Sequence, residues 1–214
     1  MFQKESISPS RREIEAKLVS VGDYVKIDYL TRCLKSNLDF DTRRFVLMKL
    51  ADLYEARRMF LEAGKMIISG AEINTTSVAK IADFMRSTDL FIRGGAVDQA
   101  ESAFGKALAY ADGIQRDRLK NQRKELYKKQ AQEYVSKDRR KNAMDLYEKF
   151  ISLPDLDLGE KREAQEVLLS LYDKLGKIRE YGNLRRALSE PTTQSGAKAR
   201  QVNEKQTQGF NRII

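Results

Sequence analysis

The feature that most constrains this chain is a repeat in which large side chains recur at intervals of 36, 37, 43 and 38 residues. These reference positions are Leu18, Tyr54, Phe91, Tyr134 and Tyr172. Four residues after each of them come Gly22, Arg58, Gly95, Asp138 and Gly176. Most of these residues suit a tight turn, because glycine and short polar side chains tolerate a left-handed backbone. A period in this range indicates a chain built from stacked copies of one small unit.

Four further columns show what each unit contains. Nine residues after the reference come Ile27, Ala63, Ala100, Ala143 and Tyr181, which in the middle units are small enough for two helices to cross closely. The positions thirteen and sixteen after it lie one turn apart on a second helix. The position thirteen after the reference is occupied by Thr31, Ile67, Phe104, Tyr147 and Arg185. The position sixteen after it is occupied by Leu34, Gly70, Ala107, Phe150 and Leu188. Seven before it, the middle units carry Leu47, Phe84 and Tyr127. Each unit is therefore predicted to be a pair of helices.

The chain is predicted to be all-α, because long stretches between its three prolines contain no helix breaker. The expected pairs are 11–20 with 23–36, 42–56 with 59–72, 77–92 with 96–111, 116–135 with 139–152, and 160–174 with 177–188. A capping box at Ser10 to Glu13 starts the first helix. We therefore expect a flexible N-terminus over 1–10, a helical-repeat domain over 11–188, and a disordered tail over 189–214. The apolar tip of that tail, Phe210 to Ile214, is either a short binding segment or folds back onto the last pair.

The pattern resembles the tetratricopeptide repeat over residues 11–189. The best matches are 50–54 (LADLY) with Glu62-Ala63, 94–100 (GGAVDQA) with Phe104, and 168–176 (LLSLYDKLG). The tryptophan of the family is replaced by Leu47, Phe84 and Tyr127, and every interval exceeds the usual length of about 34 residues. Such long units are similar to the divergent solenoids of vesicle-fusion adaptors. The resemblance implies a right-handed superhelical array of about five antiparallel helix pairs; an unrelated helical bundle is the alternative.

The resemblance also implies a binding groove lined by the first helix of each pair. The expected lining is Met48, Asp52, Ala56, Met85, Asp89, Arg93, Lys128, Gln132, Ser136, Glu166, Ser170 and Lys174. The candidate partner-binding residues among these are Met48, Asp52, Met85, Asp89, Arg93, Lys128 and Gln132. Methionine adapts to apolar side chains of a partner, although Met48 and Met85 are also explained as residues buried between pairs. One subset of the family binds the C-terminal carboxylate of a partner through Lys and Asn at these positions. This chain has Met48 and Asp52 there, so we expect it not to bind chaperone C-termini.

A basic segment over 116–141 is the strongest electrostatic feature of a chain with net charge +9. Its candidate contact residues are Arg116, Arg118, Lys120, Arg123, Lys124, Lys129, Arg139, Arg140 and Lys141, and it also contains Lys128 and Lys137. Lys and Arg along one extended helix could follow a phosphate backbone. A solvated helix face is the simpler explanation of these residues. Tyr127 and Tyr134 fall in repeat columns, so they are not counted as stacking platforms for bases.

Catalytic chemistry has little support in this sequence. Histidine is absent, and the single cysteine, Cys33, can form neither an intramolecular disulfide nor a cysteine zinc site. There is no G-x-x-x-x-G-K-[ST] phosphate loop. We therefore expect no enzyme activity, no cofactor and no metal. No stretch approaches the roughly 18 apolar residues that span a bilayer, and the start lacks the apolar core of a signal peptide, so a cytoplasmic protein is expected.

The sequence thus predicts a non-catalytic scaffold or adaptor that binds a protein partner, or serves as a subunit of a larger assembly. The alternative is an RNA- or ribosome-associated helical-repeat protein that uses the basic segment 116–141. A third hypothesis is an enzyme or a regulatory domain with a small-molecule ligand. The identity of the partner and the oligomeric state are left open.

Overall fold

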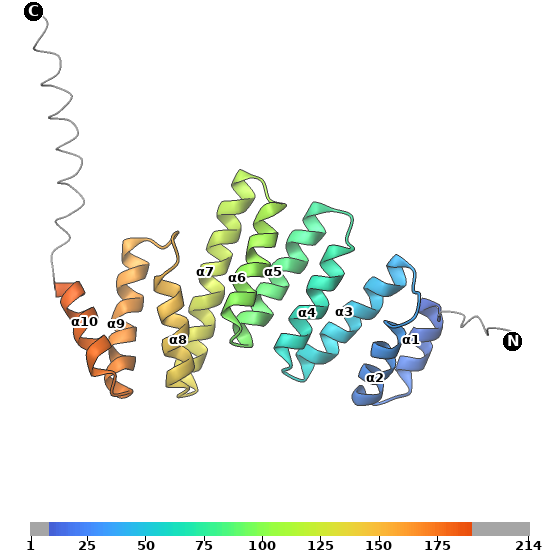
Figure 1. The fold of residues 1–214 in the computed structure, drawn as a ribbon, viewed down its shortest axis with the longest axis horizontal. Helices are drawn as coiled ribbons and strands as arrows, with labels where there is room; N and C mark the ends of the chain where they lie inside the picture. Colours follow the sequence, from blue (N-terminus) through green and yellow to red (C-terminus); the bar gives the residue numbers. More distant parts are fainter. Residues whose placement is uncertain (1–8, 190–214) are drawn as a thin grey trace, which may run out of the picture.

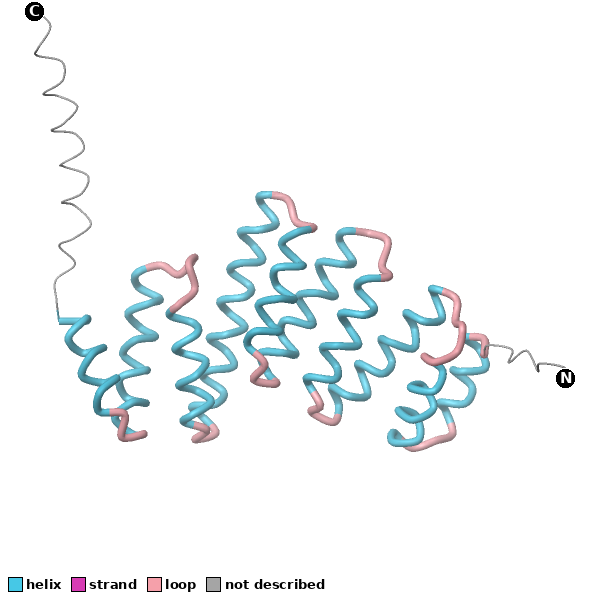
Figure 2. Tube along the Cα trace, in the orientation of Figure 1, coloured by secondary structure: helices cyan, strands magenta, loops and turns pink. Residues whose placement is uncertain are grey.

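A computed structural model describes residues 9–189, and within this range the chain is helical with no strand. The helices stand side by side in one row that bends into an arch, with α1 and α10 at opposite ends (Figures 1 and 2). Their bounds are α1 (Arg11–Val19), α2 (Asp23–Cys33), α3 (Phe40–Ala56), α4 (Phe60–Glu72), α5 (Ser77–Arg93), α6 (Val97–Ala109), α7 (Gly113–Ser136), α8 (Arg140–Ile151), α9 (Leu158–Lys174) and α10 (Ile178–Ser189). We call α1, α3, α5, α7 and α9 the first helices and the others the second helices. Ser189, the first residue of the predicted tail, is instead the last residue of α10. The rest of that tail, and most of the predicted N-terminus, lie outside the described residues.

The all-α prediction is confirmed for this range, and most predicted helix ends lie within two residues of those observed. Two ends differ more. Helix α2 ends at Cys33, because the backbone after it turns more tightly than an α-helix does. The Ser36 hydroxyl donates to the Cys33 carbonyl at 2.6 Å. Helix α7 begins three residues before its predicted start, because Asp112 and Gln115 form a capping box that sequence reasoning overlooked.

Four of the predicted turns share one geometry. Arg58, Gly95, Asp138 and Gly176 have φ angles of 59°, 74°, 53° and 67°. In each turn the carbonyl of the reference residue accepts from the backbone N–H five positions later at 2.8 Å. This is the Schellman arrangement, which satisfies the last carbonyls of a helix. Gly22 departs from the pattern, since its φ is −73° and it caps the N-terminus of α2.

Glycine at the two left-handed non-glycine positions should stabilise the protein. Arg58→Gly and Asp138→Gly remove the Cβ penalty of the left-handed backbone, so we expect each to raise the free energy of unfolding by up to about 1 kcal/mol. Gly95→Ala should lower it by a similar amount. Urea denaturation would measure all three changes. A loss of stability in both glycine variants would contradict this account of the turns.

The predicted core columns are buried in the middle units. Ala63, Ala100 and Ala143 are completely buried, as small residues at close helix crossings should be. The buried positions of the other columns are Leu47, Ile67, Gly70, Phe84, Phe104, Ala107, Tyr127, Tyr147 and Phe150. In the first and last units Thr31 and Arg185 are exposed. The end units have a neighbour on one side only, so their columns need not all be apolar.

Close packing is visible where α4 crosses α5. A Cβ added at Gly64 would lie 2.7 Å from Cε1 of the Phe91 ring, too close for any side chain. The Ser87 hydroxyl donates to the Gly64 carbonyl at 3.0 Å across the same contact. A missing side chain on α4 thus lets the backbones of the two helices approach.

The join between α6 and α7 is one of the weakly packed places in the row. Helices α3 to α6 each pack extensively on the next, and so do α7 to α10, but α6 touches α7 only slightly and α5 packs against α7 instead. The hydrophobic cluster that contains Phe91, Tyr127 and Leu168 runs through this join. The long repeat interval of 43 residues falls here, and it reflects the length of α7.

Candidate functional site

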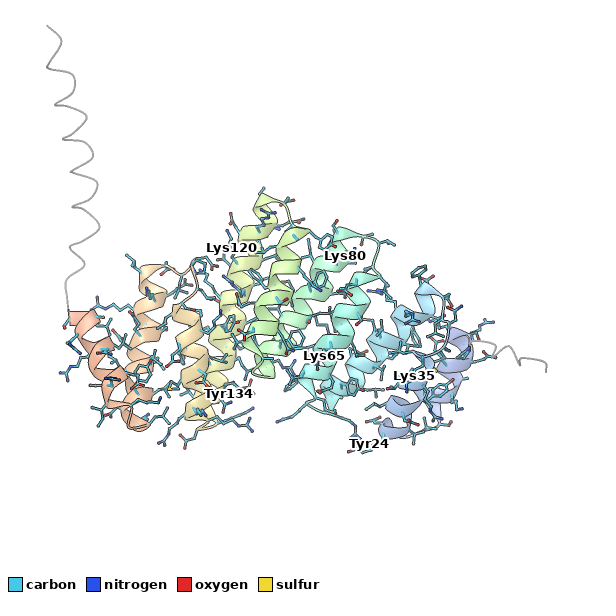
Figure 3. All side chains as sticks on the ribbon, in the orientation of Figure 1. Tyr24, Lys35, Lys65, Lys80, Lys120 and Tyr134 are labelled. Atoms are coloured by element: carbon cyan, nitrogen blue, oxygen red, sulfur yellow. The ribbon has the colours of Figure 1, made fainter. Side chains whose placement is uncertain are left out.

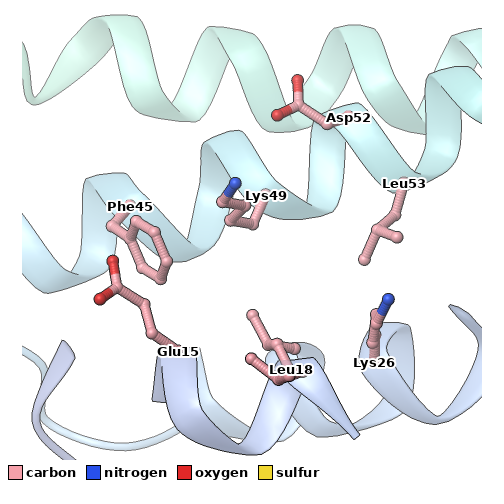
Figure 4. A pocket seen from close by; sticks show the side chains of 8 residues that line it. Glu15, Leu18, Lys26, Phe45, Lys49, Asp52 and Leu53 are labelled. Carbon is pink, nitrogen blue, oxygen red and sulfur yellow. The ribbon is translucent and has the colours of Figure 1, made fainter. Parts of the chain in front are cut away.

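The face formed by the first helices carries a series of hollows. The N-terminal hollow, of about 490 Å³, is lined by residues of α1, α2 and α3. Its floor contains Leu18, Phe45 and Leu53, and its rim contains Glu15, Lys26, Lys49 and Asp52 (Figure 4). The upper hollow, of about 390 Å³, lies between α5 and α7 and is lined by Val78, Ile81, Met85, Arg118 and Leu119, among others. Both combine an apolar surface with charged or polar groups, as many ligand sites do.

Two further hollows are also lined largely by residues of the first helices and of the turns that follow them. The turn-edge pocket, of about 610 Å³, lies where the ends of α3, α5 and α7 meet the following turns. It lies at the lower edge of the row in the view of Figure 3, where Tyr134, one of its lining residues, is labelled. A small hollow of about 50 Å³ lies between α7, α8 and α9, with Lys128 and Gln132 in its wall. The hollows thus follow the first helices across successive pairs.

An ion-pair network ties α3 to α5 on this face. The Arg86 guanidinium donates to Asp52 at 2.8 Å and to Glu55 at 2.9 Å. Arg93 binds Glu55 at 2.6 Å and Asp89 at 3.4 Å. Burial opposes ionisation of Glu55, but hydrogen bonds and charges from Arg86 and Arg93 outweigh it and lower the Glu55 pKa. Burial dominates at Asp89 and raises its pKa despite the charge of Arg93.

These two shifts predict opposite responses to pH. A lowered pKa means that Glu55 contributes stability at neutral pH, and this is lost as the pH falls through its folded pKa, below the ordinary value of 4.5. Glu55→Gln should therefore lower the free energy of unfolding by about 1 kcal/mol at pH 7, with the difference vanishing under acid. A raised pKa means that the stability from Asp89 is present below the ordinary value of 3.8 and is lost as the pH rises through its folded pKa. Asp89→Asn should thus be neutral or slightly stabilising at pH 7.

Urea unfolding of both variants at several pH values measures this prediction. Equal losses from Glu55→Gln and Asp89→Asn at pH 7 would contradict it, because the two carboxylates would then act alike.

The structure places every predicted groove residue on a first helix, and five of the seven candidate partner-binding residues also line a hollow. Asp52 lies at the N-terminal hollow, Met85 at the upper hollow, Arg93 at the turn-edge pocket, and Lys128 and Gln132 at the small hollow. The side chains of Met48 and Asp89 are half-buried. Met48 is placed in the packing between α3 and α4, with its methyl group against Gly70.

Two residues of this face escaped the sequence analysis. Glu55 and Arg86 are the centre of the ion-pair network, but neither falls at a position that the resemblance marks. Arg86 lies 34 residues after Asp52 and 31 after Glu55. A one-repeat spacing between opposite charges on first helices is the signal that could have revealed this pairing.

Arg123 corrects the prediction of a surface basic patch over 116–141. This residue is only 6% exposed. Its guanidinium binds Glu101 of α6 at 2.8 Å, pairs with Asp155 of the α8–α9 loop, and lies 4.3 Å from the centre of the Phe104 ring. Tyr127 donates to the same Glu101 at 2.8 Å. Arg123 lies in the join where α6 and α7 barely touch, so its charge is paired inside the fold and is not presented at the surface.

Most other basic side chains of this segment already have partners. Lys124 and Lys128 bind Glu160 and Glu163 of α9 at 2.8 and 3.0 Å. Arg116 donates to the Leu108 and Ala111 carbonyls near the end of α6, and Lys120, Lys137 and Arg140 pair with nearby acids of α7 and its turn. Among the described residues, Arg118, Lys129, Arg139 and Lys141 have no ion-pair partner. Part of the positive charge of this segment is therefore neutralised by contacts within the protein.

The range 9–189 contains no group of three or more Cys, Asp or Glu side chains arranged to hold a metal ion. None of the helices in it combines the length and the apolar character needed to cross a membrane.

Comparisons with known proteins assign no family to this chain. No family model matches it, and no curated protein sequence does. Among solved structures, it is similar to BtubC (BKLC) from P. vanneervenii at 14% identity, over 85% of this chain and 81% of that one, with a TM-score of 0.33. A similarity this distant supports no argument about function.

Proposed function

We propose that this chain is a non-catalytic scaffold of the tetratricopeptide-like type, which binds a protein partner along the face of its first helices. The observation that carries the proposal is the series of hollows on that face, which lie outside the buried core and cross from pair to pair. An extended segment or a helix of a partner could contact several units at once. Preformed hollows on packed helices reduce the ordering cost of binding.

The repeated turns support the tetratricopeptide-like assignment. Four turns share one hydrogen-bond pattern, and a small or half-buried residue follows each left-handed residue five positions later. This regularity indicates copies of a single unit. Stacked units of this kind form superhelical arrays with extended binding surfaces. We therefore include the superhelical array in the proposal.

The mixed lining of the face fits recognition by both apolar and charged contacts. The apolar floors at Phe45 and Met85 would accept apolar side chains of the partner. The rims at Lys49, Asp52 and Arg118 would set its orientation. Binding to RNA is the second candidate, and it rests on the basic side chains of α7 and α8 that have no ion-pair partner within residues 9–189.

Two triple variants with equal charge changes test the proposal. Lys49→Glu, Met85→Glu and Gln132→Glu alter the face of the first helices. Lys65→Glu, Gln99→Glu and Ser102→Glu alter exposed positions of α4 and α6. Tagged wild-type and variant proteins would be used to capture partners from the native lysate, with and without nuclease, and bound proteins would be quantified by mass spectrometry. We expect a defined set that survives nuclease, is lost with the first variant and is kept with the second.

Three other results would contradict the scaffold. Equal loss with both variants would indicate a general charge effect. Retention with both would place binding elsewhere. Loss of the partners on nuclease treatment would favour the RNA alternative.

A further inference from the structure

The turn-edge pocket has the most charged lining of the hollows described above. Four cationic side chains, Arg58, Arg93, Lys137 and Arg139, line it together with two carboxylates, Glu55 and Glu133. Arg93 is bound to Glu55, and Lys137 is bound to Glu133. The pocket thus contains two more cationic than acidic groups.

Arg58 and Arg139 carry this excess charge. Neither forms an ion pair or a side-chain hydrogen bond with any residue between 9 and 189, although both lie in the wall of the pocket. They come from the turns after α3 and α7, so the fold brings together two arginines 81 positions apart in the sequence. The pKa of Glu133 is lowered first by its hydrogen bond with Lys137 and further by the charges of Arg93 and Arg58, which agrees with a positive potential here.

Gln130 adds an uncharged polar group to the lining. The residue as a whole is only 7% exposed, yet it lines the pocket and makes no hydrogen bond to any described residue. Its amide nitrogen and oxygen are not sealed from solvent, so a molecule in the pocket could reach them. The amide N–H₂ of glutamine can donate two hydrogen bonds to an acceptor oxygen.

We propose that the turn-edge pocket binds a small polyanionic ligand, a phosphorylated or polycarboxylate molecule, between Arg58 and Arg139, with Gln130 as a donor. A planar guanidinium donates two parallel hydrogen bonds to a carboxylate or phosphate. A volume of about 610 Å³ is within the range of small-molecule sites and exceeds what one acidic side chain of a protein partner would fill. The proposal goes beyond the scaffold function and does not depend on it.

Isothermal titration calorimetry of the purified full chain tests the proposal without any protein partner. Citrate and pyrophosphate are the two probes, with sodium chloride at equal ionic strength as the reference. We expect saturable binding of at least one probe, and the better one identifies the chemical source. In ¹⁵N NMR spectra the side-chain signals of Arg58, Arg139 and Gln130 should shift on binding.

Matched variants separate a built site from general charge attraction. Arg58→Gln and Arg139→Gln should each weaken binding about tenfold or more, since each removes charge-assisted hydrogen bonds. Arg140→Gln removes the adjacent arginine, which pairs with Asp138 and does not line the pocket, so it should change the affinity less than twofold. Because none of the three side chains supports the core, circular dichroism should show all variants folded.

Absence of saturable binding by both probes would overturn the proposal. Equal weakening by Arg139→Gln and Arg140→Gln would also overturn it, because the anion would then sense only net charge.

Discussion

Replacing Arg123 with alanine is expected to lower the free energy of unfolding by about 3–5 kcal/mol, the usual cost of breaking a buried ion pair. The substitution would leave the carboxylates of Glu101 and Asp155 without their cation in a largely buried site. It would also remove the guanidinium that lies against the Phe104 ring. Burial and the Glu101 carboxylate raise the pKa of Tyr127, so the phenol stays a donor but cannot replace the lost charge. Urea denaturation followed by circular dichroism would measure the loss.

Arg118→Ala is the matched control for this prediction. Arg118 is an exposed arginine on the same helix, without an ion-pair partner among the described residues, so its removal should change stability by less than about 0.5 kcal/mol. If Arg123→Ala also stayed within that limit, the buried cluster would have no structural role.

Replacing Ala100 with arginine should have the second large effect, and we expect it to abolish the cooperative fold or to cost more than about 4 kcal/mol. Ala100 is completely buried, at the start of α6, in the cluster that also contains Phe91 and Tyr134. An arginine there would have to bury its charge without a partner or push α6 away from α5. Lower helicity and a lower urea midpoint would report the damage.

The control for this variant is Gln99→Arg, one position earlier in the same helix turn and exposed. It adds the same charge at the surface, so its unfolding midpoint should match that of the wild type. A stable Ala100→Arg variant would show that α6 can shift without cost, and the small-residue column would then have another explanation.

The face of the first helices could be predicted only in part. The positions that the resemblance marks lie on first helices, and five of the seven candidate residues lie at a hollow. The position of a residue relative to its helix pair follows from a local period, so it can be read from the chain. Whether Asp52 stays available or binds Arg86 depends on how α3 packs beside α5.

The sequence by itself determined the helix pairs, their turns and the buried columns of the middle units. These features are local, because a left-handed turn residue, a capping box and a helical period each act within a few residues of the chain. Only the tertiary structure decided which charges are internal. Arg123 meets Glu101 and Asp155 from 22 and 32 positions away, and Arg58 meets Arg139 at one pocket, through packing across units. A run of lysines and arginines looks the same in the sequence whether its side chains face solvent or close a join between helices. Burial and partners distinguish the two, and both are set by helices distant in the chain.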